Sequence, residues 1–102
     1  MKLTKQDIDL IGRCLRAAVS GPYFSDCEFQ TLFGLTREEV AAVAGTWPQS
    51  LDTDAVKVAV QATLNNLTGY PHKLEAPLCA ELGVDMVEVE SVFRRWMSRS
   101  TD

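Results

Sequence analysis

The stretch that decides the fold is FGLTREEVAAV, residues 33–43, which is followed four residues later by Trp47. Its counterpart LGVDMVEVESV, residues 82–92, begins 49 residues further along the chain and is followed at the same distance by Trp96. The register continues upstream without a gap, through three identical pairs: Thr4 with Thr53, Leu15 with Leu64, and Pro22 with Pro71. Self-similarity at a fixed interval indicates an internal repeat. We therefore interpret the chain as one structural unit written twice.

The first unit begins with the pattern of a long helix and a short one. The long segment, with Thr4 as a plausible N-cap and Gly21 and Pro22 as its stop, carries apolar and charged residues at helical spacing. The expected inner face is Ile8, Ile11, Leu15 and Ala18, and the expected solvent face is Asp7, Asp9, Arg13 and Arg16. A short helix over about 26–33 follows. Gly34 is expected to be its left-handed C-cap.

The third helix of this unit is predicted from the capping residues at its N-terminus. Thr36, followed three residues later by Glu39, forms the capping-box pattern that opens a helix. Its expected inner face is Val40, Val43, Ala44 and Trp47. Pro48 lies just past the expected end, where proline is common.

The second unit repeats this plan. Thr53 or Asp54 is expected to cap a helix that ends at residues 69–71. A short helix with Pro77 in its first turn is expected to close at Gly83. A third helix then begins at an acidic version of the capping box, formed by Asp85 and Glu88.

These patterns predict an all-α fold, a compact six-helix domain spanning residues 1–102. The repeats cover about 4–49 and 53–98, with a hinge at 48–52 that is too short to separate two domains. A three-helix unit of this size is too small to bury a core alone. We therefore expect the two units to pack face to face about a pseudo-two-fold axis, with Trp47 and Trp96 in equivalent buried positions.

The composition limits the classes of protein to which the chain can belong. The chain is 46% hydrophobic and 24% charged, with a net charge of −4, which is typical of a soluble globular domain. No apolar run is long enough to span a bilayer and no secretory signal precedes the first helix, so we predict a cytoplasmic protein without a membrane partner. Three cysteines without a CxxC pair favour reduced thiols over a disulfide framework or a zinc site. We expect no metal and no cofactor.

Residues 82–92 also match the helix-turn-helix pattern of DNA-binding proteins. The second helix of that motif begins with carboxylates (Asp85, Glu88 and Glu90), which repel a phosphate backbone. Its basic residues, Arg94, Arg95 and Arg99, lie at the far end, where cations complement the helix dipole. We therefore favour a structural three-helix unit, and a nucleic-acid reader is the alternative.

The segment NNLTGYPH, residues 65–72, is open to two interpretations. Its two adjacent asparagines each sacrifice roughly half a kcal/mol of helix propensity relative to alanine, so a compensating role is expected. Their amides either tie down the following loop or the C-terminal carbonyls of the helix, or they line a polar binding site with Tyr70 and His72. In the second interpretation, Tyr23 and Phe24 of the matching first-unit loop join Tyr70 as aromatic anchors for a partner.

Asp26 and Glu28 in the first unit also allow two interpretations. They could hold a cation or meet a basic partner. Alternatively, Asp26 complements the dipole at a helix N-terminus, which is the commoner use of such a residue.

Residues 28–40, the pair Trp47 and Pro48, and residues 65–72 resemble segments of small bacterial proteins of about this length, which are uncharacterised. The likeness covers most of the chain. It implies a bacterial, cytosolic origin. It supplies no catalytic residues to carry over.

We predict a non-enzymatic protein-binding module, because the chain lacks a phosphate-binding loop and any nucleophile with an obvious local base. The most concrete version is an immunity or antitoxin-like protein whose acidity steers it to a basic partner. The expected partner-binding residues are Tyr23, Asp26, Glu28, Asn65, Asn66, Tyr70 and His72. The alternatives are a helix-turn-helix nucleic-acid binder acting through its arginines, and a structural homodimerisation domain.

Overall fold

The computed structural model describes residues 3–49, 53–69 and 73–98, which form six α-helices and no strands. The helices are α1 (Lys5–Ser20), α2 (Asp26–Phe33), α3 (Arg37–Thr46), α4 (Asp54–Gly69), α5 (Glu75–Leu82) and α6 (Met86–Ser98). The prediction of a compact all-α domain with six helices is confirmed. None of these helices combines the length and the apolar character that a membrane span requires.

The helix boundaries recur at a constant interval. The helices α4, α5 and α6 each begin 49 residues after α1, α2 and α3 respectively. The first two helices of each half are also equally long, with 16 residues in α1 and α4 and 8 in α2 and α5. The third differs, because α3 has 10 residues and α6 has 13.

The caps expected from the sequence explain where these helices start and stop. Thr4 and Thr36 are both N-caps in complete capping boxes. In the second half, the Asp85 carboxylate accepts a hydrogen bond from the backbone N–H of Glu88 at 3.0 Å. Gly34 and Gly83 end α2 and α5 with φ of 72° and 77°, the left-handed region that favours glycine.

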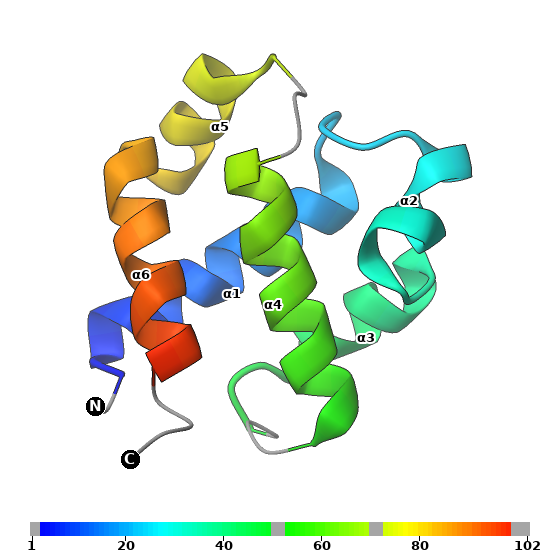
Figure 1. Cartoon of the computed structure of the whole chain (residues 1–102), viewed down its shortest axis with the longest axis horizontal. Helices are drawn as coiled ribbons and strands as arrows, with labels where there is room; N and C mark the ends of the chain where they lie inside the picture. The colour runs from blue at the N-terminus through cyan, green and yellow to red at the C-terminus, as the bar shows by residue number, and fades with distance from the viewer. Residues whose placement is uncertain (1–2, 50–52, 70–72, 99–102) are drawn as a thin grey trace.

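Helices α1 and α4 form the centre of the molecule. In Figure 1, α4 crosses in front of α1, with α5 and α6 on one side and α2 and α3 on the other. Helix α1 packs against α3, α5 and α6, and α4 packs against α2, α3 and α6. The buried side chains at the crossing include Ile11, Leu15, Val60 and Leu64, all fully inaccessible. Each half therefore uses the other to complete its core.

The two tryptophans are not equivalent, which corrects the sequence-based expectation. Trp96 lies within α6 and is 4% exposed, whereas Trp47 follows the end of α3 and is only partly buried. Proline disfavours helical geometry in the residue before it, so Pro48 holds Trp47 extended, at φ −61° and ψ 135°. The rings still meet, with centroids 6.2 Å apart, and Trp47 Nε1 donates to the Ile8 carbonyl at 2.8 Å.

Candidate functional site

The candidate site is an open groove of about 870 Å³ between α1 and the start of α6. Its lining comes from two walls and consists of Lys5, Gln6, Asp9, Leu10 and Arg13 on α1 and Val84, Asp85 and Glu88 on the α6 side. More of the exposed lining is apolar than polar, although most of the lining residues are charged. This combination is typical of a recognition site, in which apolar contact supplies affinity and a few polar groups fix orientation.

The α1 wall is a row of charged residues. Lys5, Asp9 and Arg13 follow one another at four-residue spacing and therefore share one face of the helix. Arg13 Nε lies 3.0 Å from the Asp9 carboxylate, and Arg13 Nη1 donates to the Leu82 carbonyl at 3.1 Å. Arg13 thus ties the end of α5 to α1. The neighbouring Leu10, only 6% exposed, forms part of the groove floor.

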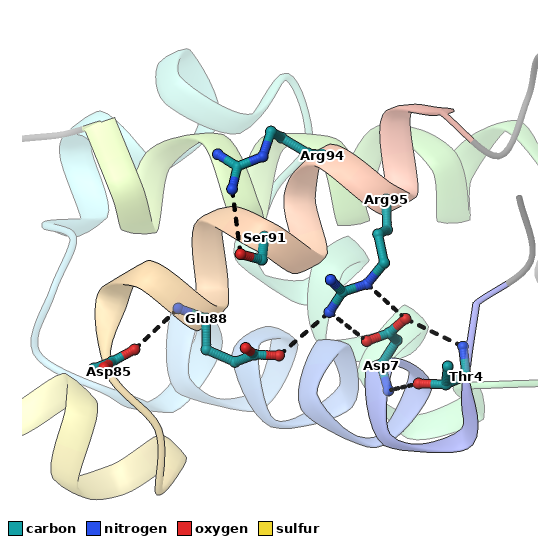
Figure 2. Close-up of polar contacts among 7 residues, drawn as sticks. All are labelled: Thr4, Asp7, Asp85, Glu88, Ser91, Arg94 and Arg95. Atoms are coloured by element: carbon teal, nitrogen blue, oxygen red, sulfur yellow. Dashed lines mark hydrogen bonds and ion pairs between the residues drawn. The ribbon is translucent and has the colours of Figure 1, made fainter.

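The α6 wall is organised by Arg95. Figure 2 shows its guanidinium reaching from α6 to α1, between Glu88 and Asp7. Arg95 donates to both carboxylate oxygens of Asp7, at 3.0 and 2.8 Å, and to Glu88 at 3.2 Å. The Asp7 side chain is 4% exposed. Its burial corrects the prediction that Asp7 faces solvent, and the cause is this partner 88 residues away in the chain.

The ionic contacts leave the α6 wall acidic. The hydrogen bond from Arg95 lowers the pKa of Asp7, so Asp7 is ionised at neutral pH. One guanidinium is therefore shared by two carboxylates, Asp7 and Glu88, and the cluster keeps one net negative charge. Asp85 adds a second negative charge one helical turn from Glu88. On the opposite wall, the Asp9 charge is paired by Arg13, which leaves Lys5 as a cation at the start of the row.

Two of the aromatic residues expected to anchor a partner belong to the core. Tyr23 is 4% exposed and Phe24 is 5% exposed. The Tyr23 hydroxyl donates to Glu81 at 2.7 Å, linking the α1–α2 loop to α5. Burial, together with the neighbouring Glu81 carboxylate, raises the pKa of Tyr23 to about 12. The expectation that Tyr23 is a surface anchor is therefore corrected, because its ring and its hydroxyl are used within the fold.

The two asparagines point in different directions. Asn66 is 7% exposed, and its side-chain nitrogen donates to the carbonyls of Leu32 at 3.1 Å and Ala62 at 2.8 Å. Asn66 therefore has the structural role. One acceptor, Ala62, belongs to its own helix, as one of the expectations had it, and the other, Leu32, belongs to α2 rather than to the following loop. Asn65 is exposed and lines a shallow groove of about 290 Å³ with Leu32 and residues of α4.

The remaining predicted site residues lie elsewhere. Asp26 and Glu28 are exposed in the first turn of α2, where Asp26 pairs with Arg37 Nη2 at 3.0 Å and Glu28 accepts a hydrogen bond from Ser25 Oγ at 3.0 Å. Tyr70 and His72 lie outside the described residues. The predicted set therefore includes two buried side chains, Tyr23 and Asn66, and exposed residues on two helices, α2 and α4, and those described do not form one site.

Sequence reasoning missed the α1–α6 groove. The sequence does contain one indication of a charged surface, because Lys5, Asp9 and Arg13 recur at four-residue spacing along one helix face. The position of that row opposite Asp85 and Glu88 depends on the pairing of α1 with α6, which no local pattern encodes.

The metal-ligand, thiol and arginine candidates can each be located in the described residues. No group of three or more potential metal ligands converges within the described ranges. Burial raises the pKa of the Cys14 thiol to about 12, so the reactive thiolate is absent at neutral pH. Arg95, one of the arginines named for a nucleic-acid binder, is held by Asp7 and Glu88, whereas Arg94 points away and donates to Ser91 (Figure 2). Arg99 lies outside the described residues.

Comparison with known proteins adds no assignment, because no protein-family model, curated protein or solved structure matches the chain. The resemblance to small bacterial proteins stays a prediction.

Proposed function

We propose that this chain is a non-enzymatic protein-binding module whose partner presents a basic surface. The observation that carries the proposal is the α6 side of the groove, where Asp85 and Glu88 lie, in a lining that carries three carboxylates against two cations. A groove of this kind favours a cationic partner by charge complementarity and accelerates its approach. An immunity or antitoxin-like protein of the bacterial cytoplasm, which covers a basic toxin, is the concrete form of this proposal.

We also infer that the domain arose by duplication of a three-helix unit, with the two copies related by a pseudo-two-fold axis. The constant 49-residue interval between helix starts supports this inference. The packing supports it too: α1 lies against α3 as α4 lies against α6, and α5 lies against α1 as α2 lies against α4. The second copy does not repeat the ion pair of Asp9 and Arg13 on α1, since these residues align with Val58 and Ala62 of α4.

The test is affinity capture of the tagged protein from lysate of cells that express it, at low and at physiological salt. The eluate is analysed by mass spectrometry and for nucleic acid. We expect one stoichiometric basic protein whose recovery decreases as salt screens the attraction. An eluate of nucleic acid, or of the bait alone at both salt concentrations, contradicts the proposal.

A further inference from the structure

We propose that the α1–α6 groove receives one amphipathic helix of the partner, with basic side chains facing Asp85 and Glu88 and an apolar side chain on Leu10 and Val84. This inference rests on the proposed function and specifies the segment of the partner that binds. The partner segment is expected to be a helix because the groove has charged residues along its two sides and apolar residues between them.

The apolar part of the argument comes from the floor. Leu10 is 6% exposed and Val84 is partly buried, so both present a small apolar surface inside a charged rim. One aliphatic side chain of a partner covers such a surface and is removed from water by doing so. A purely ionic ligand leaves this floor hydrated. The groove therefore favours an occupant that is both apolar and cationic.

The spacing of the carboxylates selects a helix. Asp85 precedes α6 and caps it, and Glu88 lies in the first turn, so the two carboxylates are three residues apart at the start of this helix. Basic side chains at positions i and i+4 of a partner helix are also close neighbours, with β-carbons about 5–6 Å apart. One face of a helix can therefore meet both carboxylates while an adjacent residue contacts the floor.

The charge on α1 gives the bound helix a direction. Arg13 contacts the end of α5, and Asp7 contacts Arg95 near the end of α6, so α1 and α6 run antiparallel along the groove. Asp85 consequently lies toward the Arg13 end, and Lys5 lies at the opposite end. An acidic partner residue fits beside Lys5, and the basic pair fits at the other end. The partner helix is thus expected to carry its acidic and basic residues at opposite ends.

The test uses three synthetic peptides of about 15 residues, a length at which helix formation is marginal until binding assists it. The first combines alanine and leucine with lysines at i and i+4 at one end and a glutamate at the other. The second exchanges the lysines for glutamates. The third has the charges of the first but glycine in place of alanine, so it cannot hold a helix. Affinity is measured by fluorescence anisotropy, and the site is located from NMR amide shifts.

We expect the helical cationic peptide to bind most tightly and to shift amides of residues 5–13 and 84–88. Asp85→Asn removes one charge while keeping an N-cap residue, and should weaken binding about twofold to fivefold, as for an exposed ion pair. Gln6→Trp fills the groove at an exposed position and should abolish binding. Glu38→Gln, which removes one exposed charge from the first turn of α3, is the matched control and should change nothing.

The outcomes separate the two proposals. If the glycine peptide binds as tightly as the helical one, or if binding survives Gln6→Trp, the helix-in-groove inference is overturned while the preference for a basic partner stands. If neither cationic peptide binds more tightly than the glutamate peptide, the helix-in-groove inference is overturned, and so is the proposal that the partner is basic. If a captured basic protein binds Gln6→Trp as tightly as the parent chain, the proposed function is supported and the proposal that the groove is the binding site is overturned.

Discussion

The helix pairs α2–α3 and α5–α6 follow one local plan, but a different arginine ties each pair to α1. Arg37, the first residue of α3, donates to the carbonyls of Ala18 at 3.3 Å, Val19 at 2.7 Å and Phe24 at 2.9 Å. Its guanidinium also lies 4.4 Å from the centre of the Phe29 ring. Arg95, near the end of α6, instead binds carboxylates, above all that of Asp7.

This difference shows that two helix pairs with matching boundaries can be docked by unlike chemistry. The Arg37 attachment satisfies backbone carbonyls in the last turn of α1 and just beyond it, and those acceptors do not titrate. Arg37 also pairs with the Asp26 carboxylate, but that side chain is 93% exposed, and such a pair contributes little to stability. The Arg95 attachment depends on an ionised, buried acid. At the position of Arg37, the second half has Met86, and at the position of Arg95, the first half has Thr46. Neither arginine attachment is therefore repeated in the other half.

The largest effect is expected from Arg37→Met, which gives the first half the residue found in the second. The change removes hydrogen bonds from a charged donor to three carbonyls and the contact with Phe29, and we expect the free energy of unfolding to fall by roughly 3 kcal/mol. Urea denaturation measures this loss. Arg37→Lys keeps the charge without the forked donors and should lose less. A loss below about 1 kcal/mol for the methionine variant would show that water replaces these bonds readily.

Asp7→Asn should have the next largest effect, because it leaves Arg95 without its buried ionic partner. We expect a decrease of about 2 kcal/mol in the free energy of unfolding at neutral pH. The matched control is Glu88→Gln, which removes the other carboxylate of Arg95 but at a site whose side chain is 47% exposed. That exposed pair should contribute less than about 1 kcal/mol. Equal losses in the two variants would contradict the assignment of Asp7 as the dominant partner.

The two attachments should also differ in their response to acid. The pKa of Asp7 in the folded chain is below its ordinary value of 3.8, so its stabilising contribution is fully present above that pH. As pH falls through the folded pKa, Asp7 is protonated and the contribution is lost. Urea midpoints measured from neutral to acid pH should therefore fall less in Asp7→Asn than in the parent chain. Arg37→Met should keep the full acid dependence, and a flattened profile there would contradict the comparison.

The glycines that end α2 and α5 also allow the two helix pairs to be compared, with a smaller expected effect on stability. Gly34→Ala and Gly83→Ala both place a side chain at positive φ, which costs about 1 kcal/mol. An added Cβ at Gly34 meets nothing within 4 Å, whereas at Gly83 it lies 3.4 Å from Arg13 Nη1. We expect the slightly larger decrease in thermal stability from Gly83→Ala, because the new Cβ contacts the Arg13 nitrogen that donates to Leu82. Equal decreases would indicate that Arg13 adapts without loss.

The smallest effect is expected at Thr63, which aligns with Cys14 of the first half. Both are fully buried, and the Thr63 hydroxyl has no hydrogen-bond partner among the described residues. Thr63→Val keeps the shape and removes a desolvated polar group, so the free energy of unfolding should be unchanged or rise by up to about 1 kcal/mol. Thr36→Val is the control, because it removes an N-cap and should cost about 1 kcal/mol. A destabilised Thr63→Val would point to a buried water bound by the hydroxyl.

Local patterns predicted the helices well because their determinants are local. The capping boxes at Thr4 and Thr36 and the positive φ of Gly34 and Gly83 depend on residues within one turn of each helix end. The extended geometry of Trp47 also has a local cause in Pro48, although the repeat suggested that it would match Trp96.

The site was predicted poorly because side-chain roles depend on distant partners. Tyr23 was expected at the surface, but it is covered by the core and bonded to Glu81, 58 residues away. Asp7 was expected on the solvent face, because the helical spacing of the apolar residues left it on the other side. Its burial requires Arg95, and the sequence contains no sign that these two residues meet.

By itself, the sequence determined six helices, their caps and the interval between the halves, since helix periodicity and capping act over a few residues. Only the tertiary structure decided which charges are buried, which arginine holds which helix, and that a groove opens between α1 and α6. Those properties arise from contacts such as Arg95 with Asp7, between residues at opposite ends of the chain. Such contacts form because α1 and α6 must each cover part of one shared core, and the charges they carry are then placed by that packing.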